Sequence, residues 1–317
     1  MKIAVIIPTK NAGADFSRVL KKLQGQRLRP DELTIYDSAS TDDTVLLARS
    51  MGVNVIPVAP ADFNHGATRE LARKQTTAEI VIFMTQDAIP VDDFLIERLV
   101  EPILDGRASF SYARQIPRQG ADIFESFPRH FNYPAESQIR SIADAEKYGV
   151  YTFFSSDSCA AYRNSALDEI GGFRPTLTSE DYFAAARLLC KGHKVAYAAG
   201  AVVEHSHAYT LLEEFRRYFD TGYVRAENPW VQAIVGQAEG RGKEYFSALV
   251  HALSARMPWL VPYAAVNTCI KLLGYRLGYR SLTAPVWWKK KLSIQRYYWD
   301  SRYYRPGVRT ETDRNEL

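Results

Sequence analysis

Residues 1–115 alternate between short apolar runs and segments with helical spacing, and this alternation limits the fold more than any other feature of the chain. The apolar runs lack the regular polar positions of a strand with one face in water, so we expect strands that are buried on both faces. The expected strands are Lys2–Ile7, Leu33–Tyr36, Val53–Val58, Ile80–Met84 and Ser109–Ala113, and the expected helices are Asp15–Leu23, Thr41–Ser50, Gly66–Gln75 and Phe94–Leu104. The pattern predicts an α/β protein with a mainly parallel sheet flanked by helices.

Polar side chains follow each of the first four expected strands, at the edge where parallel α/β sheets bind their ligands. They occur in Pro8-Thr9-Lys10-Asn11, Asp37-Ser38-Ala39-Ser40, Phe63-Asn64-His65-Gly66-Ala67-Thr68-Arg69 and Thr85-Gln86-Asp87. Asp37 is suited to accept hydrogen bonds from a base or a ribose, and Asp87 to hold a divalent cation that bridges phosphates. A turn or N-cap role is the alternative for any one of them, but four in succession favour a polar, anionic ligand. The sequence contains no GxGxxG after its first strand and no P-loop, which argues against a dinucleotide oxidoreductase and a P-loop phosphotransferase.

Two further groups of candidate site residues lie in the second half of the chain. Glu180 and Asp181 follow Ser179 at the start of an expected helix, where an ordinary capping pattern is the alternative. His205 and His207 follow an apolar run and stand at i and i+2 of an extended segment, so they point the same way and can reach one ion. A structural histidine pair is the alternative there.

Taken together, the motifs of residues 1–222 resemble those of the inverting family 2 glycosyltransferases, which have a GT-A fold. In that family the first strand ends in a P-T-x-N-like element and the second in D-x-x-S-x-D-x-T, as at Pro8–Asn11 and Asp37–Thr44 here. The family's D-x-D is represented by Thr85-Gln86-Asp87, in which only the last acid is present. The Gly171-Gly172-Phe173 turn and the Glu180-Asp181 pair are similar to the family's acceptor-side segment.

This resemblance implies a role for each matching residue. Asp181 is the expected catalytic base, supported by Glu180, because an inverting transfer needs one carboxylate to deprotonate the acceptor hydroxyl. A Mg²⁺ or Mn²⁺ ion is expected on Asp87 and His205, with His207 as the second histidine candidate. The implied donor-binding residues are Pro8, Thr9, Asn11, Asp37, Ser38, Arg69 and Gln86, and the implied acceptor-binding residues are Asp157, Ser158, Gly172 and Phe173.

Within the family, the sequence around Phe63–Arg69, Thr85–Ala88, His205–His207 and Phe215–Asp220 looks most like bacterial rhamnosyltransferases. Such enzymes use dTDP-L-rhamnose and build O-antigen or other surface polysaccharides on a polyprenyl-linked acceptor. The resemblance therefore implies a metal-dependent rhamnosyltransferase. Use of another nucleotide sugar is the first alternative. A non-catalytic nucleotide-sugar-binding protein is the second, and the missing first acid at Thr85 is its only support.

We expect two parts, a GT-A domain over residues 1–225 and a helical extension over residues 226–317. Between Lys271 and Arg305 the extension contains nine Lys or Arg, one acid and nine Tyr or Trp, with Lys289-Lys290-Lys291 directly after Trp287-Trp288. Interleaved basic and aromatic residues are typical of a segment that lies on an anionic membrane. A homodimer interface and a packed appendage are the alternatives.

The cellular setting follows from cysteine content and charge. Three cysteines without a CxxC pair are too few for a disulfide framework, so we expect the cytoplasm, with peripheral attachment to the inner face of the plasma membrane. The net charge of +4 comes from the C-terminal segment, while the rest of the chain is acidic. Because an acidic body repels a phosphate backbone, nucleic acid is not an expected partner.

Overall fold

The computed structural model describes residues 1–236 and 239–305, and these residues form two compact units. The first unit comprises residues 1–143, 153–175 and 180–207, and the second comprises residues 144–152, 176–179 and those from 208 onward. The chain thus enters the second unit for good after His207, earlier than the boundary expected after residue 225. The reason is that helix α9 (Leu211–Glu227) packs against the C-terminal helix α12 (Val261–Tyr279).

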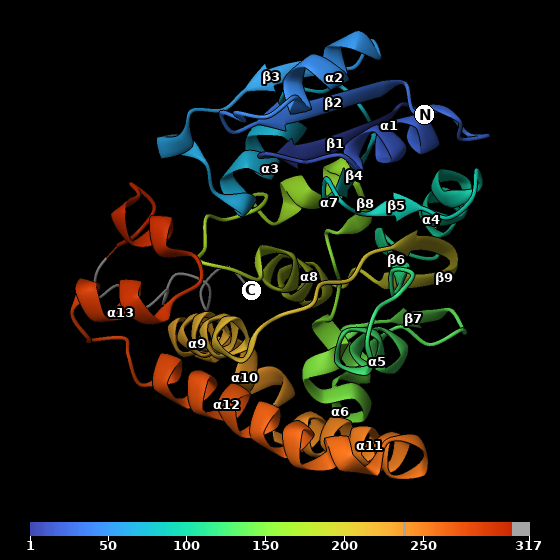
Figure 1. Cartoon of the computed structure of the whole chain (residues 1–317). Helices are drawn as coiled ribbons and strands as arrows, with labels where there is room; N and C mark the ends of the chain where they lie inside the picture. The colour runs from blue at the N-terminus through green and yellow to red at the C-terminus, as the bar shows by residue number, and fades with distance from the viewer. Residues whose placement is uncertain (237–238, 306–317) are drawn as a thin grey trace. The chain divides into compact units, whose positions relative to one another are not determined.

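One mixed sheet organises the first unit (Figure 1). Its strands are β1 (Ile3–Thr9), β2 (Glu32–Asp37), β3 (Asn54–Pro57), β4 (Ile80–Met84), β5 (Ile89–Pro90), β6 (Phe110–Ile116), β7 (Gln138–Arg140), β8 (Cys159–Arg163) and β9 (Val195–Glu204). Their order is β3-β2-β1-β4-β8-β6-β9-β5, and β7 pairs with β9. The first four strands are parallel, as expected, and so are β6 and β9. Strand β8 is antiparallel to β4 and β6, while β5 and β7 are antiparallel to β9, so only part of the sheet is parallel.

The helices expected in residues 1–115 are confirmed, with ends shifted by a few residues. The helices of the first unit are α1 (Phe16–Gln24), α2 (Thr44–Ser50), α3 (His65–Lys74), α4 (Leu95–Leu104), α5 (Ile123–Asn132), α7 (Asn164–Glu169) and α8 (Glu180–Cys190), with the 3₁₀ turns η1 (Pro60–Asp62) and η2 (Ile142–Asp144), the latter ending one residue beyond the unit. Helices α1, α3 and α4 pack on the sheet, as expected for continuous apolar strands that are buried on both faces.

The two faces of the sheet have different cores. On one face, α1 and α4 contribute Phe16, Leu20 and Leu99 to a cluster with strand residues such as Val5 and Ile82. On the other face, the rings of Phe83 and Tyr162 each meet the ring of Phe173 edge-on, with centroids 5.3 and 5.4 Å apart. An aromatic pair of this kind stabilises the fold by about 0.5–1.5 kcal/mol beyond the effect of burying the two rings. It fixes the loop that leads to α8.

Helices dominate the second unit. They are α6 (Ala145–Tyr148), α9, α10 (Pro229–Val235), α11 (Glu239–Arg256), α12 and α13 (Val286–Leu292), with the 3₁₀ turns η3 (Gly149–Phe153), η4 (Pro258–Leu260) and η5 (Arg296–Asp300). Helices α9 and α12 approach closely because glycines line the contact: a Cβ on Gly274 would lie 2.3 Å from the Phe215 carbonyl oxygen, and one on Gly278 only 1.9 Å from that of Phe219. A salt bridge of 3.1 Å between Glu214 and Lys271 adds to this contact.

The lysine cluster at 289–291 is not the free cationic surface that the sequence suggests. Lys289 is 1% exposed. Its ammonium group donates to the Leu282 carbonyl at 2.6 Å and lies 5.0 Å from the centre of the Tyr223 ring and 5.7 Å from that of Trp299. Lys290 is paired with Asp300. Lys289 is therefore not available to a membrane surface, because sequence spacing does not show which lysine an aromatic group encloses. Membrane association of this segment stays a prediction.

Replacing Gly278 with alanine should lower the free energy of unfolding by about 1–3 kcal/mol, the usual cost of overpacking, because the new methyl group would force α9 and α12 apart. Urea unfolding followed by circular dichroism measures the change. Gly242→Ala on α11 is the matched control, since its Cβ would meet nothing within 4 Å. There we expect unchanged or slightly increased stability. Equal effects of the two variants would contradict the close contact.

Candidate functional site

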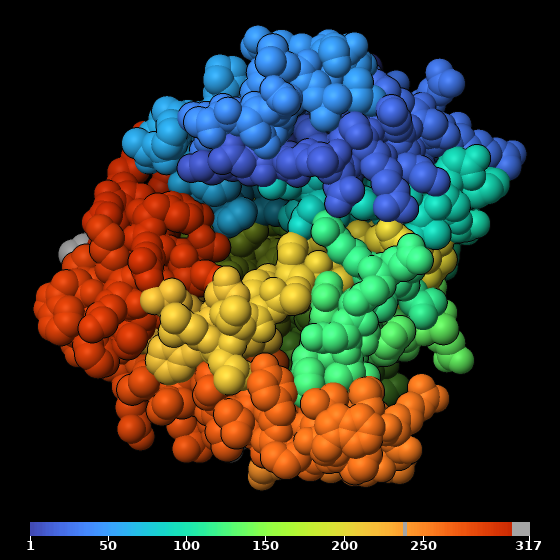
Figure 2. Space-filling view, viewed as in Figure 1, coloured from blue at the N-terminus to red at the C-terminus, as the bar shows by residue number. Residues whose placement is uncertain are grey.

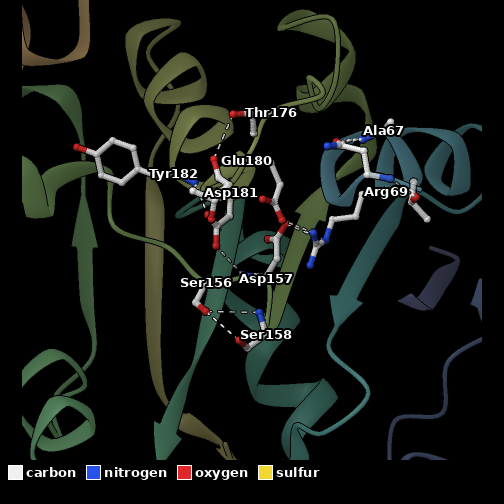
Figure 3. Close-up of polar contacts among 12 residues, drawn as sticks. Ala67, Arg69, Ser156, Asp157, Ser158, Thr176, Glu180, Asp181 and Tyr182 are labelled. Carbon is white, nitrogen blue, oxygen red and sulfur yellow. Dashed lines mark hydrogen bonds and ion pairs between the residues drawn. The ribbon is translucent and has the colours of Figure 1, made fainter. Parts of the chain in front are cut away.

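A buried group of charged side chains lies in the first unit, where α3, the turn before β8 and the start of α8 come together (Figure 3). The guanidinium group of Arg69 is 3.2 Å from a carboxylate oxygen of Asp157 and forms an ion pair with Glu180. All three side chains are buried. Two carboxylates thus share one arginine, and Asp157 also accepts a hydrogen bond of 2.7 Å from the Tyr162 hydroxyl.

Local sequence positions these groups. Asn64 caps α3 by accepting a hydrogen bond of 3.2 Å from the amide of Ala67, which fixes the start of the helix that carries Arg69. Gly66 is needed next to it because a Cβ there would lie 2.2 Å from the Arg174 carbonyl oxygen. On the other side, Ser179 has a φ of +64°, a strained value for a residue with a side chain, immediately before α8.

Asp181 is the accessible carboxylate of this group. One of its oxygens accepts the amide N–H of Tyr182 at 2.7 Å and the other accepts that of Asp157 at 3.3 Å. Burial and the negative charges of Glu180 and Asp157 raise the pKa of Asp181 to about 8. A carboxylate whose pKa lies near neutral pH is an effective general base. The pKa of Glu180 is lowered instead, because its ion pair with Arg69 outweighs its burial.

Several residues expected to touch the ligands lie in the interior instead. Asp157 is 1% exposed, Gly172 and Phe173 are buried, and the Arg69 guanidinium is taken up by carboxylates. The side chains of Asp157 and Phe173 therefore present almost no surface to a ligand, and the Arg69 guanidinium pairs with two carboxylates in this structure. Ser158 remains partly exposed and accepts the amide N–H of Thr85 through its carbonyl oxygen at 3.1 Å.

A second group, the metal-site cluster, consists of Asp87, His205 and His207, whose ligand atoms all lie within 4.8 Å of one another. The two Nε2 atoms are 3.2 Å apart, and each lies 3.3–3.5 Å from a carboxylate oxygen of Asp87. Burial and the nearby charge of His205 lower the pKa of His207 to about 4, so its ring is neutral at pH 7. Burial favours the neutral form of Asp87, but its hydrogen bond to His205 and the charges of both histidines hold its pKa below the usual range.

Gln115 orients one of these histidines, and the sequence offered no sign of it. Its side-chain oxygen lies 2.9 Å from Nδ1 of His205, so in the neutral form of the ring this nitrogen carries the proton and Nε2 presents its lone pair to the cluster. The amide nitrogen of Gln115 donates to the Ser156 hydroxyl at 2.8 Å. Two imidazole nitrogens and a carboxylate that converge in this way fit a divalent cation of the Mg²⁺, Mn²⁺ or Zn²⁺ class.

The expected donor residues are brought together at the carboxyl ends of β1, β2 and β4. Asp37 accepts hydrogen bonds from the hydroxyls of Thr9 and Ser40, the first at 3.0 Å, and Asn11 accepts the amide N–H of Thr41 at 2.8 Å. The side chain of Gln86 bonds the backbone of Lys10 in both directions, at 2.8 and 3.1 Å. Thr9, Asp37 and Ser38 are buried, while Pro8, Asn11 and Gln86 are accessible. Thr9, Asp37 and Ser38 therefore hold the loops in shape, while Pro8, Asn11 and Gln86 lie at the loop surface, where a ligand can contact them.

Comparison with known proteins agrees with this geometry. The model of the family described as glycosyl transferase family 2 matches residues 4–171. The chain belongs to this family. It is 41% identical over 307 residues to the O-antigen chain rhamnosyltransferase RfbN of Salmonella typhimurium (strain LT2), which covers 96% of this chain and 98% of that protein. It is 38% identical over 303 residues to the O-antigen chain rhamnosyltransferase WbaN of Salmonella anatum, covering 95% and 96%.

Solved structures show the same GT-A fold. The mannosyltransferase PcManGT from Pyrobaculum calidifontis, in complex with GDP-Man and Mn²⁺, matches with a TM-score of 0.58 at 18% identity and 87% coverage of both chains. TarS 1-349 of S. aureus in complex with UDP-GlcNAc matches with a TM-score of 0.52 at 17% identity, covering 89% of this chain and 91% of that one. The chain is thus an inverting family 2 glycosyltransferase with a GT-A fold.

Replacing Asp181 with asparagine should lower turnover of this glycosyltransferase by about 10²–10⁴-fold, the usual contribution of a general base. The free energy of unfolding at pH 8 should stay equal or rise, because the variant removes one acid from a buried acidic group. Initial rates and urea unfolding of the same preparations measure both quantities. Near-wild-type turnover would mean that Asp181 has a structural role at the start of α8 and is not the general base.

The pH profile gives a second test of the base. Since the base acts when deprotonated, kcat/KM should rise as the pH passes through about 8. Glu180→Gln removes a negative charge beside Asp181, so the rising limb should move to lower pH. Glu169→Gln, an exposed acid paired with His193, is the control and should leave the limb in place. If Glu180→Gln does not move the rising limb, the limb reports the titration of a group other than Asp181.

Proposed function

We propose that this glycosyltransferase moves L-rhamnose from dTDP-L-rhamnose to a sugar hydroxyl of a lipid-linked precursor of a surface polysaccharide. The observation that carries the proposal is the likeness to two O-antigen chain rhamnosyltransferases over nearly the whole chain, including the helices of the second unit. A family match over the first unit alone would support transfer of a sugar without indicating which one.

In the proposed reaction Asp181 takes the proton of the acceptor hydroxyl while that oxygen attacks the anomeric carbon. The bond between this carbon and the diphosphate oxygen breaks, dTDP leaves from the opposite face, and the product is an α-L-rhamnoside. Glu180, held by Arg69, keeps Asp181 basic through its negative charge. No second nucleophilic carboxylate is required.

Asp87, His205 and His207 would hold a Mg²⁺ or Mn²⁺ ion on the leaving-group side. Such an ion supplies positive charge to the departing diphosphate. Gln115 fixes the His205 tautomer, and the deprotonated Asp87 with a neutral His207 is the protonation state that a metal requires. Pro8, Asn11 and Gln86, the accessible residues at the strand ends, are proposed to line the site of the thymidine moiety, above the buried Thr9, Asp37 and Ser38.

Donor identity is tested by calorimetric titration with dTDP-L-rhamnose, dTDP-glucose, UDP-glucose and GDP-mannose, each with Mn²⁺, with Mg²⁺ or with EDTA. We expect the tightest binding for dTDP-L-rhamnose with a divalent ion, and a loss of the ion's effect in Asp87→Ala. Glu97→Ala, an exposed acid on α4, is the control and should bind like wild type. If another nucleotide sugar binds more tightly, dTDP-L-rhamnose is not the donor. If the protein binds the nucleotide sugar equally well in Mn²⁺ and in EDTA, the metal has no part in donor binding.

We further propose that α12 of the second unit lies on the cytoplasmic face of a membrane that carries the acceptor. Among the described residues no helix is long and apolar enough to cross a bilayer. The outer side of α12 and of the turn before it nevertheless carries a stripe of exposed apolar side chains, while its glycines face α9. Figure 2 shows α12 in orange at the surface of its unit. The stripe consists of Trp259, Tyr263, Val266, Leu272 and Leu273, with Trp259 71% and Leu273 52% exposed.

The positive charge around this stripe favours an anionic lipid surface as its binding partner. Residues 245–299 contain no Asp or Glu, and exposed Arg256, Arg276 and Arg280 lie near the ends of the stripe. A helix with this composition binds in the plane of the headgroups through its apolar side chains and its cations. A second copy of the chain would bring the same positive charge to the contact and is disfavoured by repulsion.

The double variant Trp259→Ser/Leu273→Gln should lose sedimentation with vesicles of phosphatidylglycerol, while transfer to a soluble acceptor analogue stays near wild type. Both side chains are exposed, so stability should change little. Leu46→Ser, at an exposed leucine on α2, is the matched control and should keep vesicle binding. If wild type sediments as a dimer without vesicles and the double variant as a monomer, the stripe is a subunit interface and the membrane proposal fails.

A further inference from the structure

Helix α5 and the segment before it are tied to the loop that carries the two histidines of the metal-site cluster. Ser206, between His205 and His207, donates its hydroxyl to Glu125 of α5 and accepts the amide N–H of Arg118 at 3.0 Å. Asp122 caps α5 by accepting the amide N–H of Glu125 at 2.9 Å. The positions of residues 118 and 125 relative to the cluster are thus fixed by direct hydrogen bonds.

The side chain of Arg118 lies against Asp87. One of its terminal nitrogens donates to the backbone carbonyl of Asp87 at 3.1 Å and is 3.9 Å from the Asp87 carboxylate. The second distance is too long for a hydrogen bond. Its Nε is buried without a hydrogen-bond partner, and the side chain is 34% exposed. Arg118 therefore lies at the cluster with most of its five N–H donors unused.

Arg129 follows Glu125 by one turn of α5, so the two side chains share a face of the helix. It is half-buried, and its Nε has no hydrogen-bond partner. In the described part of the chain no carboxylate lies within salt-bridge distance of it. Its positive charge is nevertheless close enough to His207 to help lower the pKa of that ring.

We propose that Arg118 and Arg129 form a binding site for a diphosphate group beside the metal-site cluster, an inference that rests on the proposed function. Guanidinium groups bind phosphate oxygens through paired hydrogen bonds, and such charge-assisted bonds are strong where water is partly excluded. Arg118 has only a long ion pair with Asp87, and no carboxylate among the described residues pairs with Arg129, so both cations keep N–H donors that a ligand can use. The diphosphate comes either from the nucleotide sugar or from the lipid carrier of the acceptor.

Binding of inorganic pyrophosphate, measured by calorimetry with Mn²⁺ and with EDTA, tests the site without a base, a sugar or a lipid. We expect Arg129→Gln to weaken it by about 10- to 100-fold under both conditions, the usual range for a hydrogen-bonded charged group. Arg118→Gln should act in the same direction. Arg107→Gln is the matched control, since Arg107 is exposed and paired with Asp105 and Glu101. Mn²⁺ affinity of the variants should stay at or above that of wild type, because each change removes a positive charge near the ion.

Two further titrations identify the source of the diphosphate. A loss of affinity for dTDP in Arg129→Gln assigns the site to the donor. Unchanged dTDP affinity with weaker binding of a short isoprenyl diphosphate assigns it to the acceptor. Because pyrophosphate carries no sugar, failure of the rhamnose assignment leaves this test intact.

The proposal is overturned if Arg118→Gln and Arg129→Gln bind pyrophosphate as wild type does, or if both lose Mn²⁺ as well, which would indicate a distorted cluster. Arg129→Lys keeps the charge but loses the paired geometry, and it should bind pyrophosphate with intermediate affinity. This variant provides the comparison even if the glutamine variants are poorly folded.

Discussion

Three segments far apart in the chain meet at one buried guanidinium group, that of Arg69, and the catalytic side of the molecule depends on this contact. Asp157 and Glu180 approach it from the turn before β8 and from the start of α8. Removing one partner of such a buried group typically costs 3–5 kcal/mol, because the remaining charges stay buried without compensation. Arg69 thus holds the two carboxylates beside Asp181. Burial and the negative charges of Glu180 and Asp157 raise the pKa of Asp181, while the charge of Arg69 partly opposes this.

The two parts of the site are linked by hydrogen bonds as well as by the sheet. His205 contacts Gln115, which contacts Ser156, and the next residue, Asp157, donates its amide N–H to Asp181. A change at the metal-site cluster can thus reach Asp181 through fixed polar contacts. Buried networks of this kind define one arrangement strongly when every member is satisfied.

The second unit depends on close packing of helices and on a buried lysine. Its main helices α9 and α12 approach each other at glycines. Lys289 is buried, and its ammonium group lies close to the rings of Tyr223 and Trp299 instead of in water. With Lys289 buried and Lys290 paired with Asp300, the apolar stripe of α12 and its arginines become the surface best suited to a membrane. Cation and aromatic content alone did not indicate which element would present that surface.

The sequence by itself determined the elements whose periodicity is strong and the residues that stand directly after them. The strands of residues 1–115 and the convergence of Asp87 with His205 and His207 follow from that local order, because parallel strands place their carboxyl ends at one edge. Asp181 was singled out as the base by the family resemblance, and that role stays a prediction. Only the tertiary structure decided the direction of β8, the burial of Asp157, Phe173 and Arg69, the role of Gln115 and the enclosure of Lys289. Each of these depends on which distant segment packs against the residue, and sequence spacing carries no information about that partner.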